Sequence, residues 1–226
     1  MKKEIYTLME TYMLSCMDNS AHDREHVYRV LYNALDIAQT EENVDYDVLI
    51  SACLLHDVGR KEQFENPKLC HAMVGADKAY HFLREQGFDE AFSEKIKSCI
   101  QTHRYRKNNL PQSIEAKILF DADKLDAAGA VGIGRTLLYN GQAQEPLYSL
   151  LADGQISDGT GDEKPSFFQE YKYKLEKVYS HFYTQRGAEI ARTRQQAAAD
   201  YYSSLFGEVC FSYENGVQEL AKRLEA

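Results

Sequence analysis

Histidine and aspartate are the residue types whose spacing in this chain points to chemistry. His56 and Asp57 are adjacent at the polar end of the apolar segment VLISACLLH, which predicts a helix near 46–57 that ends in two polar side chains. His26 lies earlier and Asp123 later, each in a different segment with helical periodicity. Imidazole and carboxylate groups suit Mn, Fe, Zn, Ni or Co in a site that leaves positions open for water. The order His, His-Asp, Asp therefore indicates a divalent metal, while a structural His-Asp pair explains the spacing equally well.

Three aspartates interrupt an otherwise apolar stretch of predicted helix. Asp121, Asp123 and Asp126 lie within the segment KILFDADKLDAAGAVGIGRTLLY. A buried carboxylate is costly unless a cation pairs with it, and a divalent cation would also lower the pKa of a bound water to generate a nucleophile. A solvated helix face explains the same pattern, and the spacing alone does not choose between the two.

The elements that must position these residues are helices. Apolar residues recur at three- and four-residue spacing along most of the chain, and no segment shows sustained alternation, so we predict an all-α fold without a sheet. Asn19 or Ser20 is expected to cap the second helix. The helices are predicted over 5–16, 20–39, 46–57, 69–86, 89–103 and 113–141, followed by a helix pair after Ser166.

The 226 residues are expected to form one domain. With 44% hydrophobic and 27% charged residues, the chain is not mostly disordered. Residues 141–165 are rich in Gly, Asp and Pro and predict a long surface loop. This loop is either a lid over the site or a flexible surface insertion. This loop separates core motifs at 20–140 from C-terminal helices at 166–226. The Tyr and Phe stripes of these helices either fill the core or form the face of a homodimer.

The composition also limits the partners and the compartment. Lysine and arginine number 26 against 35 aspartates and glutamates, a net charge of −9, which argues against stable binding of nucleic acid. No apolar run approaches the ~20 residues that span a bilayer, so no membrane association is expected. The first 18 residues predict an amphipathic helix rather than a signal peptide. Five widely spaced cysteines without a C-x-x-C motif favour reduced thiols in a cytoplasmic protein.

Three motifs create a family resemblance. HDREHVYRV, LLHDVGR and FDADKLDAAGAVGIGRT resemble, in this order, the motifs of the HD superfamily of metal-dependent phosphohydrolases. The third motif and the long C-terminal helices resemble the YpgQ/YedJ-like bacterial subgroup, which contains a deoxynucleotide pyrophosphatase. The resemblance covers about residues 20–206. It implies an all-helical HD-domain bundle with a C-terminal helical extension.

The resemblance also implies ligands for a divalent cation, with Mn²⁺ first and Fe, Ni, Co, Zn or Mg as alternatives. The ligands carried over are His26, His56, Asp57 and Asp123. Asp123 is chosen over Asp121 because a basic residue and a leucine follow it, as in the family motif. The residues expected to lie behind the ligands or to face the substrate are His22, Arg29, Asp121 and Asp126.

Two further histidines depart from near relatives with a mononuclear site. His71 precedes Ala-x-x-Gly-Ala, and His103 precedes an arginine after an isoleucine-rich helix. Both are similar to the additional ligands of binuclear HD enzymes. They are therefore candidates for a second metal or a phosphate contact, with a helix cap and an exposed helix end as structural alternatives. His81 and His181 belong to no motif and are expected to be structural or surface residues.

The reaction implied by the resemblance is hydrolysis of a phosphate ester or phosphoanhydride in a small phosphorylated substrate, in particular a nucleotide. Asp57 is expected to act as a ligand and to orient the attacking water, while Arg60 and Lys124 would clamp phosphate. The cluster RYRK at 104–107 would steer an anion. The first hypothesis is a nucleoside triphosphate pyrophosphatase. The alternatives are a nucleotidase, a dinucleoside-polyphosphate hydrolase and a non-catalytic metal-binding nucleotide sensor.

Overall fold

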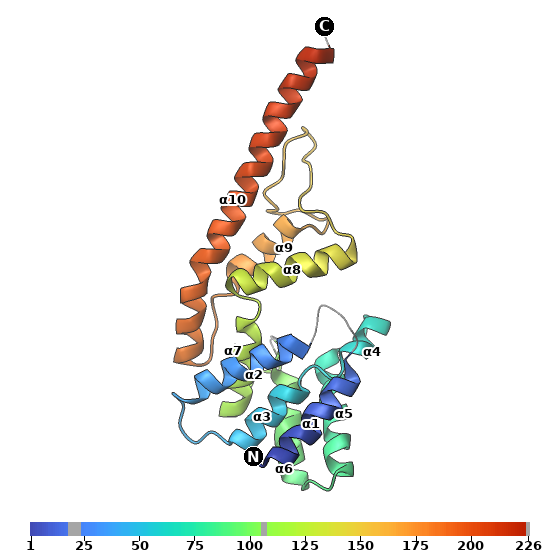
Figure 1. Cartoon of the computed structure of the whole chain (residues 1–226), viewed down its shortest axis with the longest axis vertical. Helices are drawn as coiled ribbons and strands as arrows, with labels where there is room; N and C mark the ends of the chain where they lie inside the picture. Colours follow the sequence, from blue (N-terminus) through green and yellow to red (C-terminus); the bar gives the residue numbers. More distant parts are fainter. Residues whose placement is uncertain (18–23, 105–107, 225–226) are drawn as a thin grey trace. The chain divides into compact units, whose positions relative to one another are not determined.

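The structure, a computed structural model, describes residues 1–17, 24–104 and 108–224. In these residues all regular secondary structure is helical apart from one isolated bridge between Leu150 and Ile156, which confirms the predicted all-α fold (Figure 1). The chain divides into two compact units. The first unit comprises Met1–Asp126 with His181–Ile190, and the second comprises Ala127–Ser180 with Ala191–Ala226. That the chain acts as one functional domain remains a prediction.

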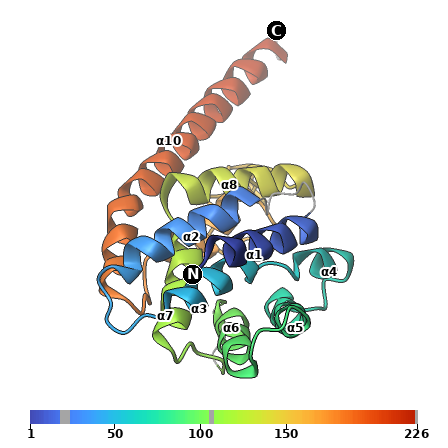
Figure 2. The same ribbon diagram turned by 60° about the horizontal axis from the view of Figure 1, so that its bottom comes forward.

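The first unit is a helical bundle arranged around α3. Its helices are α1 (Lys3–Cys16), α2 (Arg24–Ala38), α3 (Tyr46–Leu55), α4 (Arg60–Glu65), α5 (His71–Glu85), α6 (Glu90–Thr102) and α7 (Ile114–Leu125). Helix α3 is buried on nearly every side and contacts α1, α2, α6 and α7, which surround it in Figure 2. Asp45 caps this helix by accepting a hydrogen bond from the amide of Val48. Because α3 is buried, its C-terminal end delivers His56 and Asp57 to the interior of the unit.

An aromatic cluster forms the core of the second unit. This unit contains α8 (Gly129–Ala143), α9 (Phe167–Tyr173), the 3-10 turn η1 (Leu175–Lys177) and most of α10 (Gln185–Leu224). Phe167 and Phe168 are fully buried, and the rings of Tyr171 and Tyr202 stack with their centroids 4.0 Å apart. These aromatic residues therefore fill the core, which was one of the two predicted uses. The long loop lies between α8 and α9, as expected.

Two helix assignments differ from the prediction. The helix expected over 113–141 is two helices, because the chain leaves α7 and starts α8 at Gly129, whose φ of +68° is left-handed. A Cβ atom at Gly129 would also come within 2.7 Å of the Cβ atom of Arg194. The prediction missed α4, because its six residues are too few for a periodic signal. The cap predicted at Asn19 or Ser20 lies outside the described residues.

Within the part of the chain that the structure describes, no helix has both the length and the apolar character needed to cross a bilayer.

Candidate metal centre

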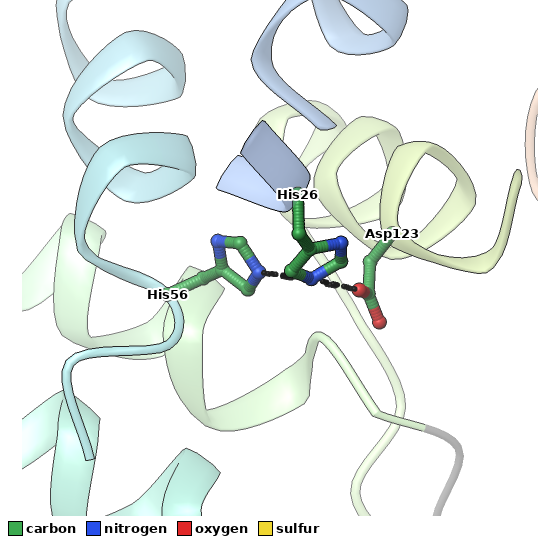
Figure 3. A group of neighbouring side chains, drawn as sticks. All are labelled: His26, His56 and Asp123. Atoms are coloured by element: carbon green, nitrogen blue, oxygen red, sulfur yellow. Dashed lines mark hydrogen bonds and ion pairs between the residues drawn. The ribbon is translucent and has the colours of Figure 1, made fainter. Parts of the chain in front are cut away.

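Side chains from three segments of the first unit converge on one point. His26 is in α2, His56 follows α3 and Asp123 is in α7. Nε2 of His26 lies 3.3 Å from Nε2 of His56 and 3.3 Å from Oδ1 of Asp123. The three side chains point toward one another in Figure 3. Oδ2 of Asp57 lies 3.4 Å from the same His26 nitrogen and 3.7 Å from Nε2 of His56. The structure thus brings together the four residues that the resemblance implied as ligands.

A second group adjoins the first. His71 begins α5 and His103 follows α6, and their Nε2 atoms are 3.3 Å apart. Both nitrogens face Oδ1 of Asp57, at 3.5 Å and 3.7 Å. We call His26, His56 and Asp123 the first half of the centre, and His71 and His103 the second half. Asp57 is shared, because each of its two oxygens faces a different half.

Backbone carbonyls fix two of the histidines through their other ring nitrogen. Nδ1 of His56 lies 2.7 Å from the carbonyl oxygen of Cys53, and Nδ1 of His103 lies 2.6 Å from that of Ile100. A carbonyl oxygen only accepts, so in both rings we assign the proton to Nδ1. Nε2 of each ring therefore presents a lone pair to the centre.

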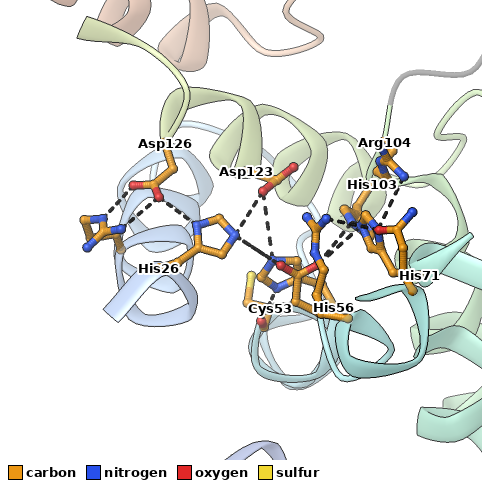
Figure 4. A network of polar contacts seen from close by, with 12 residues as sticks. His26, Cys53, His56, His71, His103, Arg104, Asp123 and Asp126 are labelled. Carbon is orange, nitrogen blue, oxygen red and sulfur yellow. Dashed lines mark hydrogen bonds and ion pairs between the residues drawn. The ribbon is translucent and has the colours of Figure 1, made fainter. Parts of the chain in front are cut away.

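A buried carboxylate supports His26. Oδ2 of Asp126 lies 2.7 Å from Nδ1 of His26, so this ring also presents its Nε2 lone pair to the centre (Figure 4). Arg29 donates to both oxygens of Asp126, at 2.7 Å and 3.0 Å. Arg29 and Asp126 therefore lie behind His26, and their charges offset each other.

An amide supports His71. Its Nδ1 lies 2.6 Å from Oε1 of Gln63 in α4. It also lies 3.3 Å from Nη1 of Arg104, which is beside His71 in Figure 4. We assign the proton to Nδ1 because the Gln63 contact is the shorter. Gln63 is a site residue that sequence reasoning missed. Its only signal is its position three residues after Arg60, in a helix too short to show a periodic pattern.

The donor set fits a divalent cation. Burial lowers the pKa of His56, and it lowers the pKa of His103 to about 4, so both imidazoles are neutral near pH 7. Nε2 of His56 faces Nε2 of His26, and Nε2 of His103 faces Nε2 of His71, each pair at 3.3 Å. Both also lie 3.7 Å from a carboxylate oxygen of Asp57, which is only 2% exposed. Such a buried set of electron-pair donors is unfavourable unless a cation joins it. In each of two groups the ligand atoms lie within 4.8 Å of one another: His26, His56 and Asp123, and Asp57, His71 and His103.

Two glycines allow the second half to approach the shared aspartate. Gly59, in the turn after the His-Asp pair, packs against Gly75 of α5, the glycine of the Ala-x-x-Gly-Ala pattern. A Cβ atom at Gly59 would lie 2.5 Å from both the amide nitrogen of Gly75 and the carbonyl oxygen of His71. Lys78 reinforces the contact by donating to the carbonyl of Val58 at 2.8 Å. Helix α5 can therefore lie directly against the turn that carries the shared carboxylate.

The two basic residues expected to clamp phosphate have different surroundings. Nε of Arg60 donates to Oδ1 of Asp57 at 2.9 Å, so this guanidinium lies at the centre. Nζ of Lys124 donates to the carbonyl of His181 at 3.1 Å and lies 4.8 Å from the ring centroid of Phe182. The structure thus places Arg60, but not the ammonium group of Lys124, in contact with a residue of the centre.

Asp121, the competing choice for the last ligand, faces a different element. Its carboxylate accepts hydrogen bonds from the amides of Tyr183 and Thr184 and from the Thr184 hydroxyl, at 2.7–3.0 Å. These bonds tie α7 to the residues that precede α10. Asp123 points to the centre instead, with Oδ1 3.3 Å from Nε2 of His26.

The remaining candidates divide into two groups. His22 and residues 105–107 of the RYRK cluster lie outside the described residues. His81 and His181 are exposed and belong to neither half of the centre.

Comparisons with known proteins find similar sequences and folds. Residues 24–128 match the model of the HD domain family. The uncharacterized protein YpgQ of Bacillus subtilis (strain 168) is 27% identical over 192 residues, which cover 83% of this chain and 84% of YpgQ. The crystal structure of YpgQ in complex with ADP has a TM-score of 0.70 at 25% identity, covering 90% of this chain and 97% of that chain. A predicted HD superfamily hydrolase from an uncultured Thermotogales bacterium has a TM-score of 0.58 at 28% identity, covering 91% of each chain.

The matched region contains both halves of the centre and the shared aspartate. The similarity to YpgQ extends beyond this region into the C-terminal helices. Residues 24–128 therefore resemble the HD domain family, and the chain has the fold of a predicted HD-superfamily hydrolase.

Proposed function

We propose that this protein is a metal-dependent phosphohydrolase that acts on nucleotides, and specifically a nucleoside triphosphate pyrophosphatase. The observation that carries the proposal is the convergence of imidazole and carboxylate donors on both sides of the buried Asp57. The fold shared with a predicted HD superfamily hydrolase supports the reaction class. The crystal structure of YpgQ with ADP supports a nucleotide as the ligand.

The first half of the centre, with Asp57, would hold the catalytic cation. Mixed nitrogen and oxygen donors of this kind suit Mn²⁺. A divalent cation bound there would polarise a phosphoryl oxygen and lower the pKa of a bound water. The contribution of the chain is to keep the donors in place. Asp126 holds His26, and the carbonyl of Cys53 holds His56, so that both Nε2 lone pairs stay directed at one point.

Arginines beside the second half would bind the phosphate chain of the substrate. Arg60 is one quarter exposed; its Nε donates to Asp57 and its Nη1 to Oε1 of Gln63 at 3.5 Å, and its other N–H groups would bind phosphate oxygens. Arg104 lies against His71 in the same region. His71 and His103 would take either a second cation or a phosphate oxygen. A phosphate contact by Lys124 remains a prediction.

Product identification tests the reaction. Protein stripped with a chelator and resupplied with Mn²⁺ or Co²⁺ is incubated with nucleoside tri-, di- and monophosphates and with dinucleoside polyphosphates. Release of pyrophosphate from triphosphates supports the proposal. Release of inorganic phosphate from monophosphates would identify a nucleotidase. Release of nucleoside diphosphate from dinucleoside polyphosphates would identify a dinucleoside-polyphosphate hydrolase. Nucleotide binding without turnover would identify a sensor.

Two ligand variants test the site. His56→Ala and Asp57→Ala should each lose bound Mn²⁺ and turnover together, because the ligands also hold the source of the nucleophile. His81→Ala is the matched control, since His81 is exposed and outside both halves of the centre. Unchanged metal content and turnover in the two ligand variants would reject the site assignment.

A further inference from the structure

The two halves of the centre differ in the groups that support their histidines. In the first half, Nδ1 of His26 lies 2.7 Å from a carboxylate oxygen of Asp126. In the second half, Nδ1 of His71 lies 2.6 Å from the neutral amide oxygen of Gln63. A carboxylate behind an imidazole makes that ring a stronger electron-pair donor to a cation than an amide does. His26 is therefore a better cation ligand than His71.

The carboxylate oxygens also differ between the halves. The first half has its own carboxylate, Asp123, with Oδ1 3.3 Å and 3.9 Å from the Nε2 atoms of His26 and His56. It also faces Oδ2 of Asp57. Among the described residues grouped in the second half, the only carboxylate donor is Asp57, which contributes Oδ1.

Fixed positive charges lie beside the second half. Nε of Arg60 is 2.9 Å from Oδ1 of Asp57, the same oxygen that faces His71 and His103. Nη1 of Arg104 lies 3.3 Å from Nδ1 of His71. On the other side, the guanidinium of Arg29 is matched by Asp126. Like charges a few ångströms apart repel strongly in a poorly solvated site, so Arg60 and Arg104 oppose a cation in the second half.

We infer that the centre loads its cations unequally: the first half with Asp57 binds one tightly, and the second half binds another weakly. The inference rests on the proposed function, in which these residues are metal ligands. It adds the order in which the two cations bind. Asp126 is expected to strengthen the tight binding step, and Arg60 is expected to weaken the other step. Both are positioning or charge-setting residues and neither belongs to the ligand set.

Calorimetric titration of chelator-stripped protein with Mn²⁺ tests the order of loading. The expected result is two steps whose dissociation constants differ by about tenfold or more, the range by which such supporting groups change metal affinity. His56→Ala should remove the tight step and His71→Ala only the weak one. Two binding steps of equal affinity would overturn the inference. So would a single binding step that His71→Ala leaves unchanged, if no second step appears up to millimolar Mn²⁺. No Mn²⁺ binding at all would instead reject the proposed function.

Two charge variants test the determinants. Asp126→Asn keeps an acceptor for His26 and should weaken the tight step about 10- to 100-fold while sparing the weak one. Arg60→Gln should tighten the weak step, and because Arg60 is partly exposed this variant tests the inference even if Asp126→Asn does not fold. Arg84→Gln is the control. It removes the same charge from an exposed side chain about 20 Å along α5 from His71 and should change neither step. A weak step that Arg60→Gln leaves unchanged or weakens further would refute the role of Arg60.

Discussion

Replacing Gly59 by alanine should separate the second half of the centre from the shared aspartate. The backbone of Gly59 has a φ of −98°, which alanine adopts without strain, so the outcome depends on space alone. The new Cβ atom would lie 2.5 Å from backbone atoms of both Gly75 and His71. Ordinary contact begins at 3.4 Å, so α5 must move by about 0.9 Å or the turn must distort.

A shift of this size would impair cation binding in the second half. His71 is the first residue of α5, so it moves with the helix, whereas Asp57 stays with the turn. Ligand atoms at metal sites tolerate only about 0.2 Å of displacement. Overpacking of a core contact also costs about 1–3 kcal/mol of unfolding free energy. We therefore expect loss of the weak Mn²⁺ step, retention of the tight step and a lower melting temperature.

Gly75→Ala is the matched comparison for Gly59→Ala. Its Cβ atom would lie 3.2 Å from the amide nitrogen of Gly59 and 3.4 Å from the carbonyl oxygen of His56, so only a few tenths of an ångström must be accommodated. Calorimetric Mn²⁺ titration and thermal unfolding of both variants provide the measurement. If Gly59→Ala binds Mn²⁺ and unfolds like Gly75→Ala, the close glycine contact does not position the second half, and the reasoning fails.

Three further predictions concern the rest of the chain. Asp121→Ala should lower the free energy of unfolding in urea by at least about 2 kcal/mol, because two buried donors of Thr184 and the partly buried amide of Tyr183 lose their acceptor; an unchanged value would contradict this role. Tyr202→Phe should cost about 1 kcal/mol in the same assay, since the hydroxyl donates to the carbonyl of Asp158 at 2.6 Å while the ring stack survives. A thiol-reactive chromophore at pH 8 should label two cysteines only after unfolding, because burial raises the pKa of Cys99 to about 12 and that of Cys53 further. The half-buried cysteines expected to react in the folded protein are Cys16, Cys70 and Cys210, and rapid labelling of all five would contradict the buried positions.

The helices were largely predictable because each buries one face of a periodic apolar pattern. The caps at Asp45 and Ser166 are local, since each side chain bonds an amide three residues ahead, and the predicted starts at these positions agree with the structure. The break between α7 and α8 was not predictable from periodicity. It depends on the left-handed backbone of Gly129 and on its close contact with Arg194, which is distant in sequence.

The candidate site was predictable in its residue types and only in part in its connections. His26 lies 100 residues from Asp126, so no local pattern reveals their hydrogen bond. The same holds for Gln63, whose contact with His71 depends on the packing of α4 beside α5. Lys124 is predicted to clamp phosphate from its place after Asp123 in the motif, whereas the bond of its ammonium group to the His181 carbonyl comes from a later segment and has no local signal.

The sequence by itself determined the helical class and the set of residues able to bind a cation, because periodicity and side-chain chemistry are properties of short segments. The tertiary structure decided the rest. It placed Asp57 between two groups of histidines, gave each ring a particular support, and set Arg60 and Arg104 beside the second half. These features depend on distances between atoms from separate helices, and such distances exist only after the helices pack.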